Sequence, residues 1–359
     1  MSRHATGAAD VLADEVVVDA DVHLTVPEEE LAEYADPPHD DYLRAPKVQL
    51  KSPGWDPTMG GKIESRNLLT VDQLESELVE GMGVDHPVLN SFVNLSRLSQ
   101  VDTAVALQRA ANDHLLDRFL DDTDYRGLMS VQTQDPAAAA EEIDRVGDEP
   151  GVVGVFLPST GPSPPLGDPT YDVMYRAMED RGLTPVFHGA TNSGFDVAFP
   201  KQNAEFRKFV EAHVNAHLWS QTMTLTSTLA HGVPEKFPDL DFVLLEAGIA
   251  YVPYMMWRLN KEFAMRRSEV PLTEKRPEEY VRERYYFASQ PLGEPMDPAH
   301  MRTMIDLVGT DSLLFASDYP HWDFDHPDEL GAYLRETFDP EEREAVLSAN
   351  ANEVFGLGL

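Results

Sequence analysis

Residues 16–24 read VVVDADVHL, a β-branched run that ends in an Asp-Val-His triplet. β-branched residues favour strands. Side chains alternate between the two faces of a strand, so Asp21 and His23 are expected to point to the same side. A carboxylate and an imidazole that converge at the end of a buried strand can bind one metal ion. Apolar runs that end in a ligand-type residue recur later in the chain, and this recurrence predicts both the fold and the site.

Short apolar runs alternate with amphipathic segments along the whole chain. The strand candidates are residues 16–19, 87–91, 127–132, 152–157, 184–188, 242–246, 285–288 and 313–317. The helix candidates are residues 70–82, 104–120, 135–146, 169–181, 252–265, 298–308 and 340–347. This alternation predicts an α/β fold, a (β/α)8 TIM barrel. A doubly wound open sheet is the alternative, but no Gly-x-Gly-x-x-Gly follows a strand, which disfavours its dinucleotide-binding version.

The chain is longer than a bare barrel, which needs about 250 residues. The surplus falls in residues 27–67, after the first strand, and residues 191–230, after the fifth. Both segments are expected to lie over the barrel mouth as lids. Residues 1–15 carry acids and no apolar core, so we expect a disordered leader and no signal peptide. Residues 16–359 are expected to form a single domain.

The chain is strongly acidic. Its 28 Lys and Arg against 63 Asp and Glu give a net charge of −35, spread over the whole length. Such a charge disfavours nucleic acid and anionic membranes as partners. Nucleic-acid mimicry is one explanation. We favour adaptation to high salt, where ~1 M ions screen charges beyond ~3 Å, because the acids are dispersed and the fold looks enzymatic. This interpretation predicts unfolding at low ionic strength.

The composition bears on location and excludes some chemistry. Cysteine is absent, so thiolate nucleophiles, disulfides and cysteine zinc sites are excluded. No stretch reaches the roughly 20 apolar residues of a membrane span. We therefore expect a cytoplasmic protein, in a high-salt cytosol, that acts on a small molecule.

Four predicted strands end in side chains of the types that bind metals. Asp21 and His23 end the first strand, and His188 ends the fifth within TPVFHG. Glu246 follows the sixth strand, and Asp318 follows the eighth within LFASDYPH. In a barrel, the C-terminal strand ends carry the catalytic residues. A single His after an apolar run is usually a packing residue, but four such ends together favour a metal centre.

These motifs, in this order, resemble the amidohydrolase superfamily. The resemblance rests on DADVH at 19–23, FHG at 187–189 and SDYPH at 317–321. The nearest branch is the amidohydrolase-related proteins akin to aminocarboxymuconate semialdehyde decarboxylase. Further stretches that resemble this branch are HGVPEKFPDL at 231–240, YVPY at 251–254 and NANEVFGL at 350–357.

The resemblance implies one divalent metal ion, with Asp21, His23, His188 and Asp318 as its ligands. It also implies that Asp318 transfers a proton. Two imidazoles and two carboxylates suit zinc, and manganese is compatible with the oxygen-rich set. No lysine lies in residues 151–158, so the carbamylated-lysine bridge of two-metal relatives is not expected.

Glu246 departs from the family pattern, because relatives with known chemistry commonly carry a His there. A His can polarise a carbonyl, whereas an ionised Glu cannot, although it can accept a proton from water. Asp21 is a smaller departure, since many relatives have His or Glu at that position. Glu246 is therefore a second candidate catalytic residue beside Asp318.

Three further residues are candidates for substrate binding. His217 lies four residues after His213, so the two share a helix face; Val214 excludes a His-Glu-x-x-His protease motif. The pair also fits a polar lid face. Arg258 can bind a substrate carboxylate in bidentate fashion or form a structural ion pair. His321 follows Asp318 closely and can contact the substrate or support the ligands.

The expected reaction is decarboxylation of a small hydroxy-aromatic or muconate-like acid, with Asp318 delivering a proton to carbon as CO₂ leaves. The alternative is hydrolysis of an amide, ester or lactone, in which metal lowers the pKa of a bound water towards ~7. A non-catalytic metal-binding scaffold is the alternative of another class. A homodimer is expected by analogy only.

Overall fold

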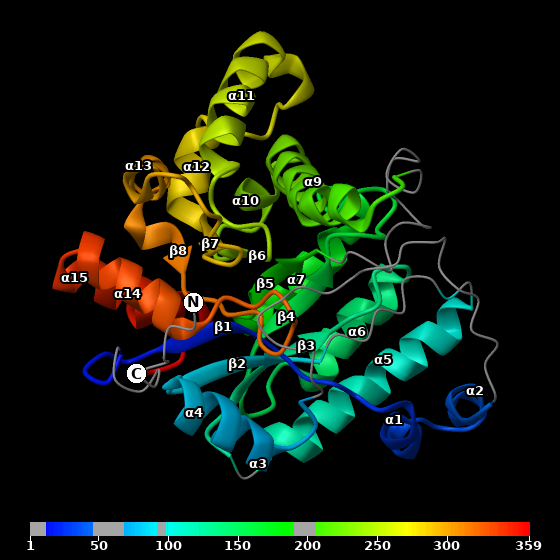
Figure 1. The fold of residues 1–359 in the computed structure, drawn as a ribbon. Helices are drawn as coiled ribbons and strands as arrows, with labels where there is room; N and C mark the ends of the chain where they lie inside the picture. The colour runs from blue at the N-terminus through cyan, green and yellow to red at the C-terminus, as the bar shows by residue number, and fades with distance from the viewer. Residues whose placement is uncertain (1–11, 46–67, 92–97, 99, 122, 190–205) are drawn as a thin grey trace.

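The computed structural model describes residues 12–45, 68–91, 98, 100–121, 123–189 and 206–359. Eight parallel strands form one sheet in the order β1 to β8, surrounded by helices (Figure 1). The strands are β1 (Val18–His23), β2 (His86–Asn90), β3 (Arg126–Ser130), β4 (Val152–Pro158), β5 (Thr184–His188), β6 (Phe242–Leu245), β7 (Tyr285–Ala288) and β8 (Leu313–Leu314).

The sheet closes on itself between its first and last strands. Val22 forms a parallel bridge with Tyr319. The backbone N–H of Ala20 donates to the carbonyl of Phe315 at 3.0 Å, and that of His23 donates to the carbonyl of Tyr319 at 2.8 Å. These bonds remove the free sheet edges, as in a closed barrel. The predicted (β/α)8 barrel is confirmed.

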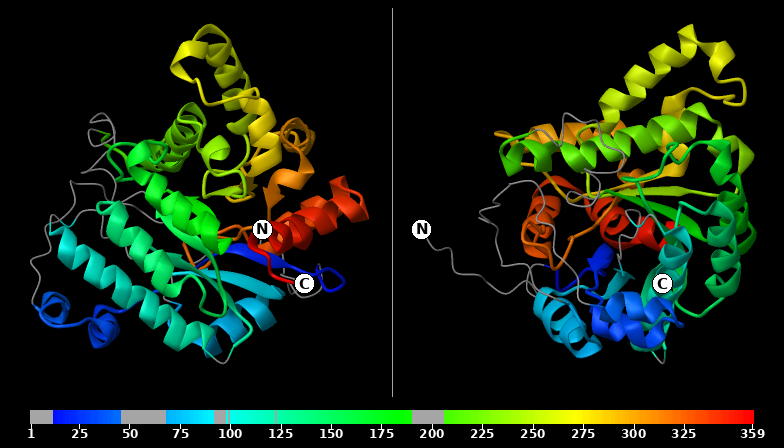
Figure 2. Two further views of the ribbon diagram at one scale, coloured as in Figure 1. Left: turned by 180° about the vertical axis from the view of Figure 1, so that it is seen from behind. Right: turned by 90° about the vertical axis from the view of Figure 1, so that its right-hand side faces the viewer.

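The helices lie outside the strands and against the ends of the barrel (Figure 2). The α-helices are α1 (Glu28–Tyr34), α2 (His39–Arg44), α3 (Val71–Gln73), α4 (Glu80–Met82), α5 (Val101–Leu115), α6 (Pro136–Val146), α7 (Asp172–Arg181), α9 (Phe209–Ala230), α10 (Val233–Lys236), α11 (Val252–Met265), α12 (Pro277–Arg284), α13 (Pro298–Val308), α14 (Pro327–Thr337), α15 (Pro340–Glu344) and α16 (Asn350–Phe355). Shorter 3-10 or π segments are η2 (Leu74–Val79), η3 (Leu116–Leu120), η4 (Pro169–Tyr171), η5 (Arg267–Glu269), η6 (Thr310–Ser312) and η7 (Ala345–Ala349).

The core has an inner and an outer part. Small and branched side chains such as Ala20, Val186 and Val243 form the inner cluster with the C-terminal Phe355. A larger cluster lies between strands and helices. The ends of the strands are thereby held in one rigid ring, which fixes the positions of the residues at its mouth.

The predicted insertions contain regular structure where the structure describes them. Residues 27–67 include α1 and α2, and residues 46–67 lie outside the described residues. Within residues 191–230, residues 191–205 lie outside the described residues, and the rest is mainly α9, which follows β5 as a barrel helix does. The role of both segments as lids stays a prediction.

The predicted leader is partly folded. Residues 1–11 lie outside the described residues. Leu12, however, is buried and packs against Gly331, where an added Cβ would come within 2.6 Å of it. Glu15 pairs with Arg343 at 3.1 Å. The folded region therefore begins before residue 16. Among the described residues, no helix is long and apolar enough to cross a bilayer.

Candidate metal and active site

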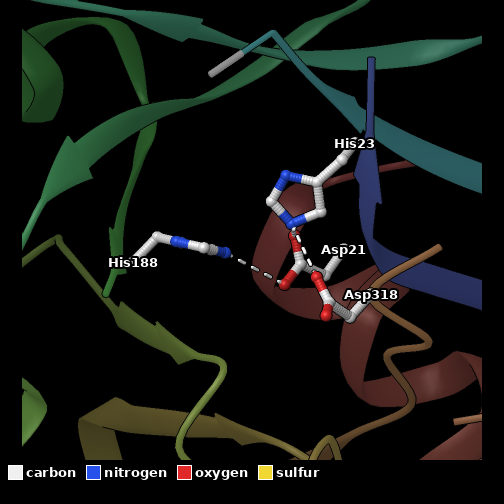
Figure 3. A group of neighbouring side chains, drawn as sticks. All are labelled: Asp21, His23, His188 and Asp318. Carbon is white, nitrogen blue, oxygen red and sulfur yellow. Dashed lines mark ion pairs between the residues drawn. The ribbon is translucent and has the colours of Figure 1, made fainter. Parts of the chain in front are cut away.

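The four predicted ligands meet at the mouth of the barrel. Asp21 and His23 come from β1, His188 from the end of β5 and Asp318 from the segment after β8 (Figure 3). One ligand atom from each lies within 4.8 Å of all the others, and all four residues are buried. His23 Nε2 lies 2.9 Å from Asp318 Oδ1, and His188 Nε2 lies 3.5 Å from Asp21 Oδ2.

The electrostatics of the cluster favour the ionised form of its two carboxylates, Asp21 and Asp318. Burial alone would raise the pKa of Asp21, but the charges of His23 and His188 outweigh burial and lower it. Burial likewise acts against ionised Asp318, yet His321 and His23 lower its pKa to about 2. The pKa of His23 lies well above its usual value, because Asp21 and Asp318 outweigh the effect of burial. The site therefore has a strong anionic potential that attracts positive charge.

The donor set fits a divalent metal ion. Two imidazole nitrogens and two carboxylate oxygens are the ligands of zinc and manganese sites, and their mutual distances suit metal–ligand bonds of about 2.0–2.3 Å. Asp21 Oδ2 is buried and makes no hydrogen bond within the described part of the chain. A buried carboxylate oxygen of this kind is costly unless a cation or donor satisfies it.

Buried amides orient the two carboxylates. Asn90, at the end of β2, donates to Asp21 Oδ1 at 2.7 Å. Gln290, just after β7, donates to Asp318 Oδ2 at 3.3 Å. Such partners fix ligand orientation in metal sites. Neither residue was predicted from the sequence. Both lie at the end of an apolar strand, so the reasoning that identified Glu246 at a strand end also applies to them.

A buried carboxylate beneath the cluster connects its two sides. Asp19 Oδ1 accepts hydrogen bonds from the backbone N–H groups of Asp21, at 3.2 Å, and Ser317, at 3.0 Å. Burial raises the pKa of Asp19 to about 7. Asp19 thus ties the backbone of β1 to the residue that precedes Asp318.

Glu246 lies beside the cluster and contacts two histidines. Its Oε2 is 3.0 Å from His188 Nε2 and 3.0 Å from His217 Nδ1. Burial, reinforced by the charge of Asp318, raises the pKa of Glu246 to about 8. Burial lowers the pKa of His217. A protonated Glu246 can donate a hydrogen bond. It could therefore polarise a carbonyl, which an ionised Glu cannot do.

Glu246 and Asp318 share an unusual backbone conformation. Their φ angles are 58° and 64°, and among the described residues no other non-glycine has a positive φ. The left-handed conformation costs roughly 1–2 kcal/mol for an L-residue. Strain of this kind is concentrated at functional sites. The unusual backbone conformation therefore occurs at the two residues that we predicted from the sequence as catalytic.

The structure places the three candidate substrate-binding residues in different surroundings. His321 lies at the site: its Nδ1 is 2.7 Å from Asp318 Oδ1, and its ring centroid is 4.2 Å from that of His23. His217 reaches Glu246, as described above. Arg258, by contrast, is exposed on α11, where it pairs with Glu262. The structure does not bring Arg258 to the cluster, and its role in substrate binding stays a prediction.

Gln221 of α9 holds three strand ends together. Its Nε2 donates to the carbonyls of Phe187, at 2.8 Å, and Leu245, at 2.7 Å, which precede His188 and Glu246. Its Oε1 accepts from Ser159 Oγ at 3.1 Å. Gln221 is fully buried. One amide therefore sets the spacing between β5 and β6 where they enter the site.

Replacing Gln221 by Leu is expected to loosen this spacing. Two buried carbonyls lose their donor, at ~1–3 kcal/mol for each unsatisfied group. We expect the free energy of unfolding to fall by about 2–6 kcal/mol and metal affinity to fall ~10–100-fold. Urea unfolding and metal titration measure the two effects. Asn215→Ala is the matched control, because among the described residues that amide bonds within its own helix; equal losses in both variants contradict the role of Gln221.

Comparison with known proteins places the chain in a family. Residues 18–357 match the model of the amidohydrolase family. The chain belongs to this family. The family resemblance stated from the strand-end motifs is therefore confirmed.

Among amidohydrolases, the chain is similar to several decarboxylases. It is 22% identical over 342 residues to gamma-resorcylate decarboxylase of Polaromonas sp. strain JS666, covering 89% of this chain and 97% of that one. The crystal structure of 5-carboxyvanillate decarboxylase from Sphingomonas paucimobilis matches with a TM-score of 0.70 and 21% identity, over 95% of this chain and 99% of that one.

A third relative carries a metal. The structure of a dihydroxybenzoic acid decarboxylase from Polaromonas sp. JS666 holds manganese and the inhibitor 2-nitroresorcinol. It matches with a TM-score of 0.70 and 18% identity, over 96% of this chain and 98% of that one. At these identities, the two structures show a shared fold.

Proposed function

We propose that this amidohydrolase is a metal-dependent decarboxylase of a small hydroxy-aromatic acid. The observation that carries the proposal is the contact between Asp318 and His321 at the rim of a four-ligand cluster, since it joins a proton donor to a metal site. The decarboxylases that the chain resembles act on aromatic acids, as their names state. A muconate-like acid is the second substrate class that we expected from the sequence.

Asp21, His23, His188 and Asp318 would hold one divalent ion. When bound, the ion supplies a fixed positive charge that attracts and orients an anionic substrate. The sequence favoured zinc, and the manganese in the dihydroxybenzoic acid decarboxylase favours manganese. The activity assay described below therefore uses both ions.

The side chains of the site supply the proton that decarboxylation consumes. Because Asp318 is ionised at rest, His321 first passes its proton to Asp318, which delivers that proton to the ring carbon that bears the carboxylate. The carbon–carbon bond breaks, its electron pair forms the new C–H bond, and CO₂ leaves. His321 then takes up a new proton from solvent, since its side chain is 42% exposed. Burial works against charge on His321, but Asp318 raises its pKa and keeps a proton available.

Aromatic side chains continue outward from Glu246. His217 contacts His213, with ring centroids 5.8 Å apart. His213 lies between Phe209 and Trp322, at 5.2 and 5.3 Å. We propose that this group accommodates the ring of the substrate, and that His217, rather than Arg258, contacts it.

Glu246 is proposed to act on the substrate as a hydrogen-bond donor. Glu246→Gln keeps a donor and is expected to retain activity within ~10-fold, whereas Glu246→Gly removes it and is expected to lose ~100-fold or more in kcat, in the range of other site donors. Glu246→Gly also relieves the positive φ, so its thermal midpoint is not expected to fall. Steady-state kinetics and thermal unfolding test this pair. Equal activity of both variants contradicts the donor role.

The function is tested by product analysis. Purified protein, loaded with Mn²⁺ or Zn²⁺ in high salt, is incubated with hydroxybenzoates that carry an ortho hydroxyl and with a panel of lactones, esters and amides. We expect CO₂ release from at least one hydroxybenzoate. Cleavage of the second panel without CO₂ release would instead establish the hydrolase. Metal binding without turnover of either panel would favour the scaffold.

We also propose that the protein works in a high-salt cytosol. The net charge of −35 supports this location, because self-repulsion is screened there.

A further inference from the structure

Gln290 is a buried amide between the two residues predicted as catalytic. It follows β7, and β7 lies between β6 and β8 in the sheet. Gln290 is therefore placed between Glu246, which follows β6, and Asp318, which follows β8. Only 1% of its surface is exposed. A polar side chain that is buried so completely normally has its hydrogen-bonding groups paired.

Hydrogen bonds on both sides fix the backbone of Gln290. Its carbonyl accepts from the N–H of Gly248, in the loop after β6, at 3.1 Å. A Cβ on Gly248 would clash with the carbonyl oxygen of Pro291, so the two loops approach each other closely. On the other side, the N–H of Ser289 donates to the carbonyl of Leu314 in β8 at 2.8 Å. The amide is therefore held in place at the mouth of the barrel.

Only the nitrogen of this amide has a partner among the described residues. Gln290 Nε2 donates to Asp318 Oδ2 at 3.3 Å. Gln290 Oε1 is buried and makes no hydrogen bond within the described part of the chain. The amide cannot be reversed, because its oxygen would then face a carboxylate oxygen and neither atom could donate. A buried acceptor is thus left beside Asp318, and it is costly unless a donor satisfies it.

Two other amides at the barrel mouth show what is particular to Gln290. Gln221 is fully paired, since its Nε2 donates to two carbonyls and its Oε1 accepts from a serine hydroxyl. Asn90 donates to Asp21, and its Oδ1 makes no hydrogen bond within the described residues. Asn90, however, contacts a carboxylate that takes no part in the proposed proton transfer. The free acceptor of Gln290 lies beside Asp318, which delivers the proton to the ring.

We infer that Gln290 Oε1 accepts a hydrogen bond from a hydroxyl group of the substrate, on the ring carbon next to the one that loses its carboxylate. The inference rests on the proposed function, in which Asp318 protonates the carbon that bears the carboxylate. The oxygen of an ortho hydroxyl is two bonds from that carbon, so it enters the part of the site that Asp318 and Gln290 share. Gln290 would thus determine specificity, because a ring without a donor at this position leaves the buried oxygen unpaired.

The binding of three ligands tests the role of Gln290 without requiring turnover. Salicylate carries the ortho hydroxyl, 2-methoxybenzoate carries the oxygen without its proton, and benzoate carries neither. Calorimetry on the full chain in high salt, at saturating Mn²⁺, gives the Kd of each ligand. We expect the wild type to bind salicylate ~10–100-fold more tightly than either of the other two, in the range for leaving one buried acceptor unpaired.

Two substitutions remove the acceptor. Gln290→Met keeps a similar side-chain length and is expected to reduce the preference for salicylate about 10-fold. Gln290→Ala cannot overpack the site and carries the same expectation. Gln221→Leu is the matched control, because its amide is fully paired within the protein. It is expected to weaken the binding of all three ligands alike and to leave the preference unchanged. Thermal unfolding confirms that each variant folds.

Three results would overturn the inference. The first is a wild-type protein without a preference for salicylate. The second is a wild-type preference that persists in both Gln290 variants, which would show that Gln290 merely orients Asp318. The third is an equal loss of preference in Gln221→Leu, which would show a general loosening of the site. A preference that depends on Gln290, in a protein that releases CO₂ from no hydroxybenzoate, would support the hydroxyl site and contradict the proposed reaction alone.

Discussion

Asp318→Asn is expected to lower kcat by at least ~10³-fold, in the upper half of the range for loss of a general acid or base. Asparagine has the same shape as aspartate but cannot take up a proton from His321 and deliver it to carbon. It also tolerates positive φ better than most residues, so the φ of 64° at this position does not prevent folding. Initial rates of CO₂ release at saturating substrate give the effect on kcat.

A matched control distinguishes the loss of proton transfer by Asp318 from the effect of removing any carboxylate near the site. Asp323→Asn removes a nearby carboxylate that pairs with His213 at 3.2 Å and lies outside the metal cluster. Its kcat is expected to stay within ~10-fold of wild type. Full turnover by Asp318→Asn would remove the proposed mechanism, and an equal loss in Asp323→Asn would show that Asp318 has no special role.

His188→Ala and Asp21→Asn are expected to lower metal affinity by more than ~100-fold, since losing a residue that merely orients a ligand already costs 10–100-fold. Each variant removes one ligand from a different strand. Asp21→Asn keeps the shape of the side chain and its contact with Asn90, so folding is protected. Titration with Mn²⁺ and Zn²⁺, followed by elemental analysis, measures the loss.

His231→Ala is the control for these variants. His231 is exposed at the C-terminal end of α9 and belongs to no ligand group among the described residues. Its metal content is expected to equal that of wild type. Undiminished metal content in both His188→Ala and Asp21→Asn would place the metal elsewhere. It would then favour the alternative that the protein is a non-catalytic metal-binding scaffold.

The sequence predicted the barrel well because strand periodicity is a local property. β5 and β7 begin and end where the apolar runs do, at 184–188 and 285–288. β8 is shorter than predicted for a physical reason. The carbonyl of Leu313 accepts from Asn350 Nδ2, and the N–H of Phe315 donates to the carbonyl of Val346, so the C-terminal helices take the bonds that a longer strand would need.

α9 was missed for the opposite reason. Its apolar residues occur on all sides, so it lacks the single stripe that identifies a helix in sequence. Its residues were therefore assigned to a lid insertion. Gln221 was missed with it, because an amide that joins two strands has no local signature. The position of Arg258 depended on the direction in which α11 leaves the barrel, which a sequence pattern does not contain.

The candidate metal ligands could be grouped from the sequence because barrel geometry brings strand ends together. Asp21, His23, His188 and Asp318 were predicted as one group, and the structure places them as one group. Glu246 was predicted at this strand end, but the sequence did not show whether its carboxyl group is ionised. Only the folded structure shows the burial that raises its pKa to about 8.

The position of the bound metal ion tests the proposed site at the barrel mouth. Crystals grown with Mn²⁺ would be measured by anomalous diffraction at the manganese edge. We expect one strong peak per chain, within bonding distance of Asp21, His23, His188 and Asp318. A strong peak elsewhere, or no peak among these four side chains at saturating Mn²⁺, would contradict it.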